Sequence, residues 1–138
     1  MRALVDTNVL VSAVFFGGVP GRVLDALVTR RFALVLSPEI LDEYRRVGAE
    51  LEGRYPRLTG TFEPVLALLA ATSILVDAPP LAESVCDDSD DDKFLAAALA
   101  ARAEVIVSGD KHLLRVTGWR GIDVLAPRSF LDRLDRGR

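Results

Sequence analysis

Short apolar segments alternate with helix-like segments along the whole chain, and this alternation restricts the possible folds more than any other feature. The predicted strands are Arg2–Val5, Ala33–Leu36, Ser73–Val76, Glu104–Val107 and Ile122–Leu125. The predicted helices are Asn8–Phe15, Gly21–Arg30, Pro38–Leu51, Phe62–Ala71, Asp91–Arg102, Lys111–Arg115 and Arg128–Arg136. Apolar strands separated by helices are typical of a parallel sheet covered on both faces. The sequence therefore predicts an α/β fold with a central parallel sheet.

The length of 138 residues, of which 50% are hydrophobic, is enough for one domain with its own core. We expect that domain to cover residues 1–138. Glycine and proline place a loop at residues 15–21 and a break between helices at residues 51–61.

The chain has one cysteine, Cys86, and one histidine, His112. An internal disulfide and a zinc site built from cysteine and histidine are therefore excluded. We interpret Cys86 as a small buried residue and His112 as a surface residue. Asp6 and Asn8 interrupt the apolar N-terminus, so it does not read as a signal peptide. The apolar stretch 65–71 is too short to span a bilayer. These features predict a cytoplasmic protein that is not embedded in a membrane.

Two predicted strands are followed by aspartate: Asp6 after the first, and Asp110 after the fourth and two further residues. The carboxyl ends of strands in a parallel sheet open onto one crevice, where ligands bind. We therefore expect Asp6 and Asp110 to meet there, with Ser108 hydrogen-bonded to a neighbouring carboxylate or to a metal-bound water. The alternative interpretation is purely structural, with Thr7 or Asn8 capping the next helix and Asp110 capping its own.

A third acid, Glu43, lies on the predicted helix 38–51. Asp42 points nearly opposite the apolar stripe of this helix, whereas Glu43 lies on its flank, at about 100° per residue. That stripe consists of Ile40, Tyr44, Val47 and Leu51. Glu43 is therefore the acid of this helix best placed to reach a crevice between helix and sheet. A solvated surface glutamate is the alternative.

The fourth acid comes from the run Asp87-Asp88-Ser89-Asp90-Asp91-Asp92, which begins a helix. An EF-hand loop is excluded, because Lys93 and Leu99 replace its glycine and its closing glutamate. Helix capping explains one or two of these acids but not five. We assign Asp91 to the site, because it shares a helix face with the apolar residues that follow it; Asp90 and Asp92 are the alternatives. A cluster of carboxylates repels itself unless a cation is bound, so the four acids predict a divalent-metal site.

The net charge of −3 does not indicate nucleic-acid binding, but its distribution is informative. Without the five aspartates of the run, the acidic residues would be fewer than the 17 basic residues. A metal at the run would cancel much of the local charge, and arginines elsewhere would be free to hold phosphates. Arg22, Arg45 and Arg46 are the candidates for such contacts. Arginines that only solubilise the surface are the alternative.

Four sequence blocks in order show a resemblance to a known family. They are Leu4-Val5-Asp6-Thr7-Asn8-Val9-Leu10-Val11-Ser12-Ala13, Leu34-Val35-Leu36-Ser37-Pro38-Glu39-Ile40-Leu41-Asp42-Glu43, Asp88-Ser89-Asp90-Asp91-Asp92-Lys93-Phe94-Leu95-Ala96-Ala97-Ala98 and Val105-Ile106-Val107-Ser108-Gly109-Asp110-Lys111-His112-Leu113-Leu114. The chain resembles the PIN-domain ribonucleases, particularly the toxin components of bacterial toxin–antitoxin systems. The acidic quartet of that family falls on Asp6, Glu43, Asp91 and Asp110.

The resemblance implies a three-layer α/β/α fold, Mg²⁺ or Mn²⁺ as cofactor, single-stranded RNA as substrate, a homodimer and a protein antitoxin. Asp6, Asp91 and Asp110 are the expected metal ligands, with Glu43 binding the metal or orienting a water. Thr7, Asn8 and Ser108 are expected to support them. A phosphatase that forms an aspartyl phosphate is the enzymatic rival, although Asn8 stands where that chemistry needs an acid. A scaffold that only binds metal or a protein is the non-enzymatic rival.

Overall fold

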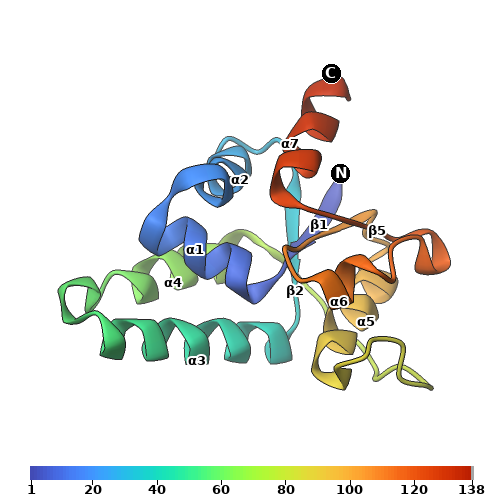
Figure 1. The fold of residues 1–138 in the computed structure, drawn as a ribbon, viewed down its shortest axis with the longest axis horizontal. Coiled ribbons are helices and arrows are strands. Elements are labelled where there is room, and N and C mark those ends of the chain that lie inside the picture. Colours follow the sequence, from blue (N-terminus) through green and yellow to red (C-terminus); the bar gives the residue numbers. More distant parts are fainter. Residues whose placement is uncertain (138) are drawn as a thin grey trace.

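The computed structural model describes residues 1–137, in which five strands alternate with seven helices (Figure 1). The strands are β1 (Arg2–Val5), β2 (Ala33–Leu36), β3 (Ile74–Leu75), β4 (Val105–Val107) and β5 (Asp123–Leu125). The helices are α1 (Thr7–Phe16), α2 (Gly18–Val28), α3 (Pro38–Arg54), α4 (Phe62–Thr72), α5 (Asp92–Ala101), α6 (Lys111–Leu114) and α7 (Pro127–Arg136). Every predicted element is present, and the bounds differ by a few residues at most.

The strands form a parallel sheet in the order β3-β2-β1-β4-β5. The first and fourth strands lie side by side at its centre, with Val5 aligned with Val107. This register continues past the ends of both strands, because the backbone N–H of Asp6 donates to the carbonyl of Val107 at 2.8 Å. Asp6 and Ser108 therefore emerge next to each other at the carboxyl edge of the sheet.

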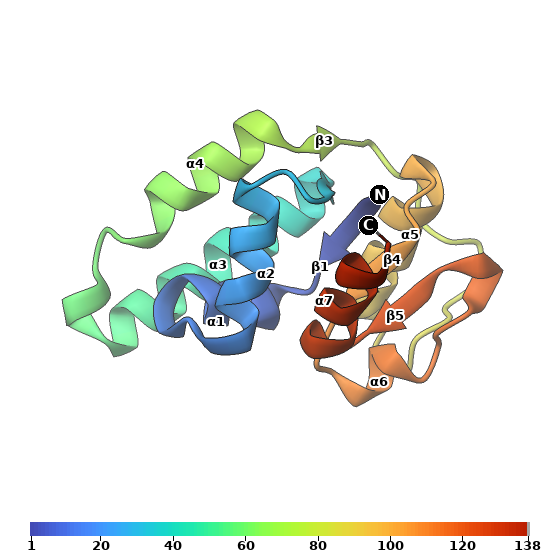
Figure 2. The ribbon, with the colours of Figure 1, turned by 90° about the horizontal axis from the view of Figure 1, so that it is seen from above.

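The central strands are apolar because helices cover both of their faces. Figure 2 shows α2 and α7 on one side of β1 and β4, and α5 on the other. The small face of α5, with Ala97 and Ala98 fully buried, allows this helix to pack closely against β1, β2 and β4. The predicted three-layer α/β/α architecture is thus confirmed.

The third helix extends away from the sheet and pairs with α1 and α4 (Figure 1). It begins as the sequence suggests: Ser37 accepts a hydrogen bond from the backbone N–H of Ile40, and Pro38 follows at the first helical position. Gly48 faces α4, and an added Cβ would lie 2.4 Å from the ring of Phe62. A side chain at position 48 would therefore force the two helices apart.

The predicted loop at residues 15–21 is wrong. Only Gly17 separates α1 from α2, and its φ of +72° makes the bend, a backbone conformation that suits glycine. Pro20 lies in the first turn of α2, where its missing N–H is tolerated. The cluster of glycines and proline thus marks a sharp helix–helix corner and not an extended connection.

In residues 1–137, no single helix has both the length and the apolar character needed to cross a membrane. Helices α1 and α2 meet those requirements only when taken together, and the pair is bent by 96°.

Candidate active site

The strand-borne part of the site is a hydrogen-bonded unit of Asp6, Ser108 and Asp110. The hydroxyl of Ser108 donates to Oδ2 of Asp6 at 2.7 Å and accepts from the backbone N–H of Asp110 at 3.0 Å. Asp6 and Ser108 are both buried. One serine hydroxyl therefore connects the ends of β1 and β4, as the sequence predicts for a neighbouring carboxylate.

The side chain of Asp110 both caps α6 and adds its charge to the acidic cluster. Its Oδ1 accepts a hydrogen bond from the backbone N–H of His112 at 2.8 Å, so it caps α6. The capping interpretation is therefore correct for this residue, and the same side chain also lies close enough to Asp6 and Asp91 for its charge to raise the pKa of both.

Glu43 reaches the strand ends from α3. Its side chain is only 16% exposed, whereas that of Asp42 is 81% exposed, as their positions relative to the apolar stripe predict. The hydroxyl of Thr7 donates to Oε2 of Glu43. The neighbouring Tyr44 is fully buried, and its hydroxyl donates to the carbonyl of Val5. This buried phenol ties α3 to the end of β1 and so positions Glu43.

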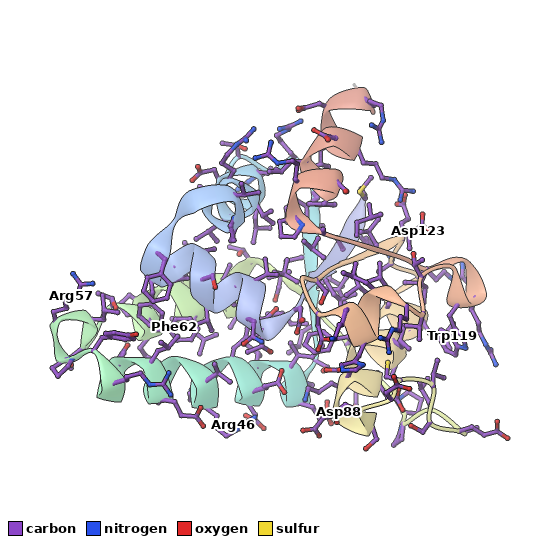
Figure 3. The ribbon with its side chains drawn as sticks, viewed as in Figure 1. Arg46, Arg57, Phe62, Asp88, Trp119 and Asp123 are labelled. Atoms are coloured by element: carbon purple, nitrogen blue, oxygen red, sulfur yellow. The ribbon has the colours of Figure 1, made fainter. Side chains whose placement is uncertain are left out.

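Two basic residues contact the other oxygen of Glu43. The ammonium group of Lys93 lies 2.6 Å from Oε1, and the guanidinium of Arg46 lies 3.8 Å from the same atom. Figure 3 labels Arg46 on α3 and Asp88 in the loop before α5. Lys93 is 20% exposed and Arg46 60%, so the pair with Lys93 is the better shielded of the two.

The aspartate run supplies one acid to the site and uses another to hold its own loop. Asp91 is half-buried, and its Oδ2 is enclosed without a hydrogen-bond partner among residues 1–137. Asp92 instead accepts hydrogen bonds from the backbone N–H groups of Cys86, at 2.8 Å, and Val85. Burial acts to raise the pKa of Asp92, but these bonds outweigh it and the pKa is lowered. Asp90 is exposed.

The pKa values of two acids report the crowding of negative charge. Burial raises the pKa of Asp6, and the charges of Glu43 and Asp110 add to the shift, against the hydrogen bond from Ser108. The pKa of Asp91 is raised to about 6, first by burial and then by the charges of Asp6 and Asp110. Four acids that are distant in sequence therefore act electrostatically on one another.

The arrangement suits a hard divalent cation. A buried carboxylate oxygen without a donor needs a positive partner, and oxygen ligands are those that Mg²⁺ and Mn²⁺ prefer. Asp91 Oδ2 is such an atom, and burial together with neighbouring carboxylates raises the pKa of both Asp91 and Asp6. Among residues 1–137, no three acidic, histidine or cysteine side chains already surround one point as ligands. Binding would therefore require side-chain adjustment, most directly of Glu43, which is held by Lys93.

The remaining predicted residues divide into those near the acids and those apart. Thr7 is buried and bonded to Glu43, and neither Thr7 nor Asn8 caps α1, whose N-cap position is taken by Asp6. The capping alternative for these two residues is therefore wrong. Asn8 is exposed. Arg46 borders the site, but Arg45 pairs with Asp42 and Glu63.

Arg22 lies elsewhere. It lines a hollow between α2 and α7 together with Asp25, Arg31 and Asp135. No sequence pattern separates Arg22 from Arg46, because the position of α2 relative to the strand ends depends on how the helices pack.

Sequence reasoning missed Lys93 and the anchoring role of Tyr44. Lys93 follows Asp91 by two positions, which places it on a different side of α5, toward α3. A basic residue directly after an acidic run was a signal available in the sequence. Tyr44 was assigned only to the apolar stripe, although a buried tyrosine hydroxyl usually has a hydrogen-bond partner.

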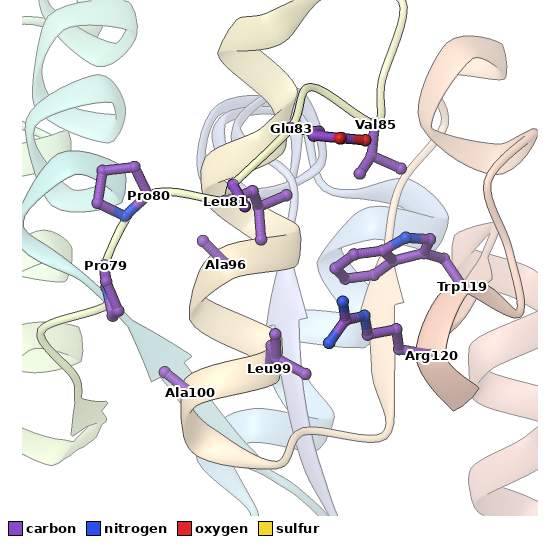
Figure 4. A pocket seen from close by; sticks show the side chains of 11 residues that line it. Pro79, Pro80, Leu81, Glu83, Val85, Ala96, Leu99, Ala100, Trp119 and Arg120 are labelled. Carbon is purple, nitrogen blue, oxygen red and sulfur yellow. The ribbon is translucent and has the colours of Figure 1, made fainter.

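A cavity of about 600 Å³ lies apart from the four acids, against the outer side of α5 (Figure 4). Leu81, Val85, Leu99 and Trp119 give it a largely apolar lining. Such a lining offers a divalent cation few ligands, so the acidic cluster remains the candidate active site. Cys86 is buried with a pKa raised to about 12, mainly by burial, and so is not an activated thiol.

The parallel sheet with acids at its carboxyl edge defines an α/β protein with a candidate cation-dependent active site. The model of the PIN domain family matches residues 2–112, so the chain belongs to that family. PIN domains are generally nucleases. An uncharacterized protein from Methanocaldococcus jannaschii is 32% identical over 119 residues, which are 83% of this chain and 74% of that protein.

The fold agrees with a solved structure as well. The crystal structure of FitAcB from Neisseria gonorrhoeae matches 91% of this chain and 98% of that chain, with a TM-score of 0.55 and 19% identity. At 19% identity the match supports the fold alone, and the chemistry must be argued from the residues of the site.

Proposed function

We propose that the chain is an endoribonuclease that depends on Mg²⁺ or Mn²⁺ and hydrolyses phosphodiester bonds of single-stranded RNA. The observation that carries the proposal is the convergence of Asp6, Glu43, Asp91 and Asp110 at the carboxyl edge of the sheet, with Oδ2 of Asp91 buried and unpaired among residues 1–137. Family membership supports nuclease chemistry. The choice of RNA rests on the resemblance to PIN-domain ribonucleases.

In this proposal Asp6, Asp91 and Asp110 hold the cation. A bound divalent cation lowers the pKa of a water and stabilises negative charge on the phosphodiester oxygens. Ser108 fixes the orientation of Asp6 through its hydrogen bond, and residues that orient metal ligands in this way usually matter for affinity and activity. Glu43, held by Thr7, either joins the ligands or orients the water.

Arg46 is the candidate for a phosphate contact, because it is exposed and borders Glu43. Asp91 directly follows the exposed residues 87–90, and Glu43, Asp91 and Asp110 are only partly buried, which leaves a single strand access to these three acids. A toxin role, with a protein antitoxin that covers the site and a homodimeric assembly, is the biological setting that the resemblance favours.

The test is cleavage of a mixed pool of single-stranded oligoribonucleotides with Mg²⁺ or Mn²⁺, and again with EDTA. We expect cleavage only with the cations. Asp6→Asn should reduce the rate by at least about 100-fold, since removing residues that merely orient metal ligands already costs ~10–100-fold. Circular dichroism should show an unchanged fold.

Asp42→Asn is the matched control, because it removes the same charge from an exposed position of α3 beside Glu43. It should retain the wild-type rate. Full activity of Asp6→Asn, or cleavage that persists in EDTA, would contradict the proposed function. A protein that binds Mn²⁺ but cleaves none of the pool would instead support a binding scaffold.

A further inference from the structure

The ion pair between Lys93 and Glu43 is the shortest one that any of the four acids makes with a basic residue among residues 1–137. The two groups are 2.6 Å apart, and both side chains are at least four-fifths buried. Once formed, a pair shielded from solvent to this degree has a stronger Coulomb attraction than a surface ion pair, because the effective dielectric is lower. Lys93 is further fixed by the ring of Phe94, whose centroid lies 5.8 Å from the ammonium nitrogen.

This pair makes the four acids unequal. Both oxygens of Glu43 have partners: Oε2 accepts from Thr7, and Oε1 faces Lys93 and Arg46. Oδ2 of Asp91, by contrast, has no partner among residues 1–137. A cation that enters the cluster therefore meets one acid that is free and one acid that is already neutralised.

We propose that Lys93 is an internal counter-cation that competes with the divalent metal for Glu43 and so lowers the affinity of the site for the metal. The inference rests on the proposed function, because it concerns the same cation site. It follows from simple electrostatics: the positive charge 2.6 Å from Oε1 of Glu43 must be displaced, or its repulsion tolerated, before a metal in the cluster gains the full attraction of that carboxylate.

A cavity beside Lys93 leaves room for its side chain to turn away from Glu43. Lys93 lines this cavity of about 300 Å³ together with Ser37, Glu39 and Asp92. The exposed carboxylate of Glu39 offers the ammonium group an alternative partner there, whereas Asp92 is already bonded to the backbone N–H groups of Cys86 and Val85. Lys93 is therefore able to leave Glu43 without losing contact with negative charge.

The experiment is calorimetric titration of Mn²⁺ into the full chain, stripped with EDTA and dialysed, at neutral pH and 0.15 M salt. Lys93→Met removes the competing charge and keeps most of the apolar stem. We expect Mn²⁺ to bind this variant about tenfold more tightly than the wild type, which corresponds to about 1.4 kcal/mol. Lys93→Gln should shift the affinity in the same direction, and it covers the case in which the methionine variant does not fold.

A second readout is thermal unfolding without metal. Both variants should unfold at a lower temperature than the wild type in EDTA, since Glu43 loses its closest counter-charge. They should gain more from added Mn²⁺ than the wild type does, because tighter binding to the folded state stabilises it further.

Lys111→Met is the matched control. Lys111 is exposed on α6 next to Asp110, and its removal changes the net charge equally. Its effect on Mn²⁺ affinity should be less than about twofold, because exposed charges are screened at this salt concentration. An equal gain in Lys111→Met would overturn the proposal, as would unchanged or weaker binding in both Lys93 variants. Absence of Mn²⁺ binding to the wild type would overturn the proposed function together with it.

Discussion

The two halves of the acidic site are built differently. On the strand side, Asp6 and Asp110 are joined through the Ser108 hydroxyl and are held by backbone groups at the ends of β1 and β4. On the helix side, Glu43 is balanced by the charge of the long Lys93 side chain, and Oδ2 of Asp91 has no partner among residues 1–137. The strand half is preorganised by hydrogen bonds, whereas the helix half is held mainly by charge.

This difference suggests that the two halves contribute differently to metal binding. Hydrogen bonds from short side chains fix geometry, because few rotamers satisfy them. Charge pairs involving a long lysine side chain allow rearrangement when another cation arrives. We therefore infer that the strand half sets where a metal binds and that the helix half sets how tightly it binds. Variants that remove one contact from each half test this view.

Among variants that remove a contact and keep the four acids, the largest effect should come from the hydroxyl that joins the strand ends. Ser108→Ala removes the donor to the buried Asp6 and the acceptor for the backbone of Asp110. We expect a loss of about 1.5–3 kcal/mol in the free energy of unfolding, the range for hydrogen bonds to charged groups. RNA cleavage should fall by ~10–100-fold, as for other residues that orient metal ligands.

Thr7→Val is the corresponding change in the helix half, since it removes the hydroxyl that donates to Glu43 and keeps the shape of the side chain. Its effect on urea unfolding and on cleavage should be smaller than that of Ser108→Ala, because Lys93 still holds Glu43. A larger loss in Thr7→Val would show that the two halves are not built as described.

An intermediate effect is expected for the pH dependence of stability in the absence of metal. The pKa of Asp91 is raised from its ordinary value of 3.8 to about 6, mainly by burial. Protonation therefore favours the folded state: the stability linked to this group is fully present below pH 4 and is lost as the pH rises through about 6. Asp91→Asn should lack this loss.

The measurement is thermal unfolding in EDTA between pH 4 and pH 8, in parallel for the wild type and Asp91→Asn. At pH 8 the variant should be the more stable of the two, and the difference should shrink toward pH 4. With Mn²⁺ present the order should reverse at pH 8, because the variant lacks a ligand. A pH-independent difference in EDTA would contradict the burial of an ionised Asp91.

The smallest effect should distinguish two exposed arginines. Arg46→Ala removes a charge that borders Glu43, whereas Arg22→Ala removes one from the hollow between α2 and α7. We expect Arg46→Ala to raise the KM for RNA a few-fold at low salt, with a weaker effect at high salt, because phosphate contacts are salt-dependent. Arg22→Ala should leave the KM unchanged. The opposite order would place the RNA-binding surface on the α2 and α7 side.

The sequence was most informative where local signals and burial agree. Asp6 and Asp110 come after two strands that are short, apolar and bounded by turns. The parallel arrangement of these strands, β1 and β4, follows from the alternation of strands with helices. The opposite orientations of Asp42 and Glu43 follow from helical spacing alone. The bend at Gly17 is not predicted from the sequence, because two consecutive glycines with positive φ, Gly17 and Gly18, make a corner that sequence patterns do not distinguish from a loop.

By itself, the sequence determined the α/β architecture, its parallel sheet and the placement of Asp6 and Asp110 after two strands, because apolar periodicity and the position of an acid after a strand are local properties. Helical spacing in the sequence only favoured Glu43 and Asp91 over their acidic neighbours. The tertiary structure alone decided the partners of those acids. In the folded chain, Asp92 accepts a hydrogen bond from the loop before α5, and Asp91 Oδ2 stays unpaired among residues 1–137. Folding also places Lys93 against Glu43, 50 positions away in the chain. Such contacts depend on how α3 and α5 pack across the sheet, and that packing is set by the summed burial of many side chains.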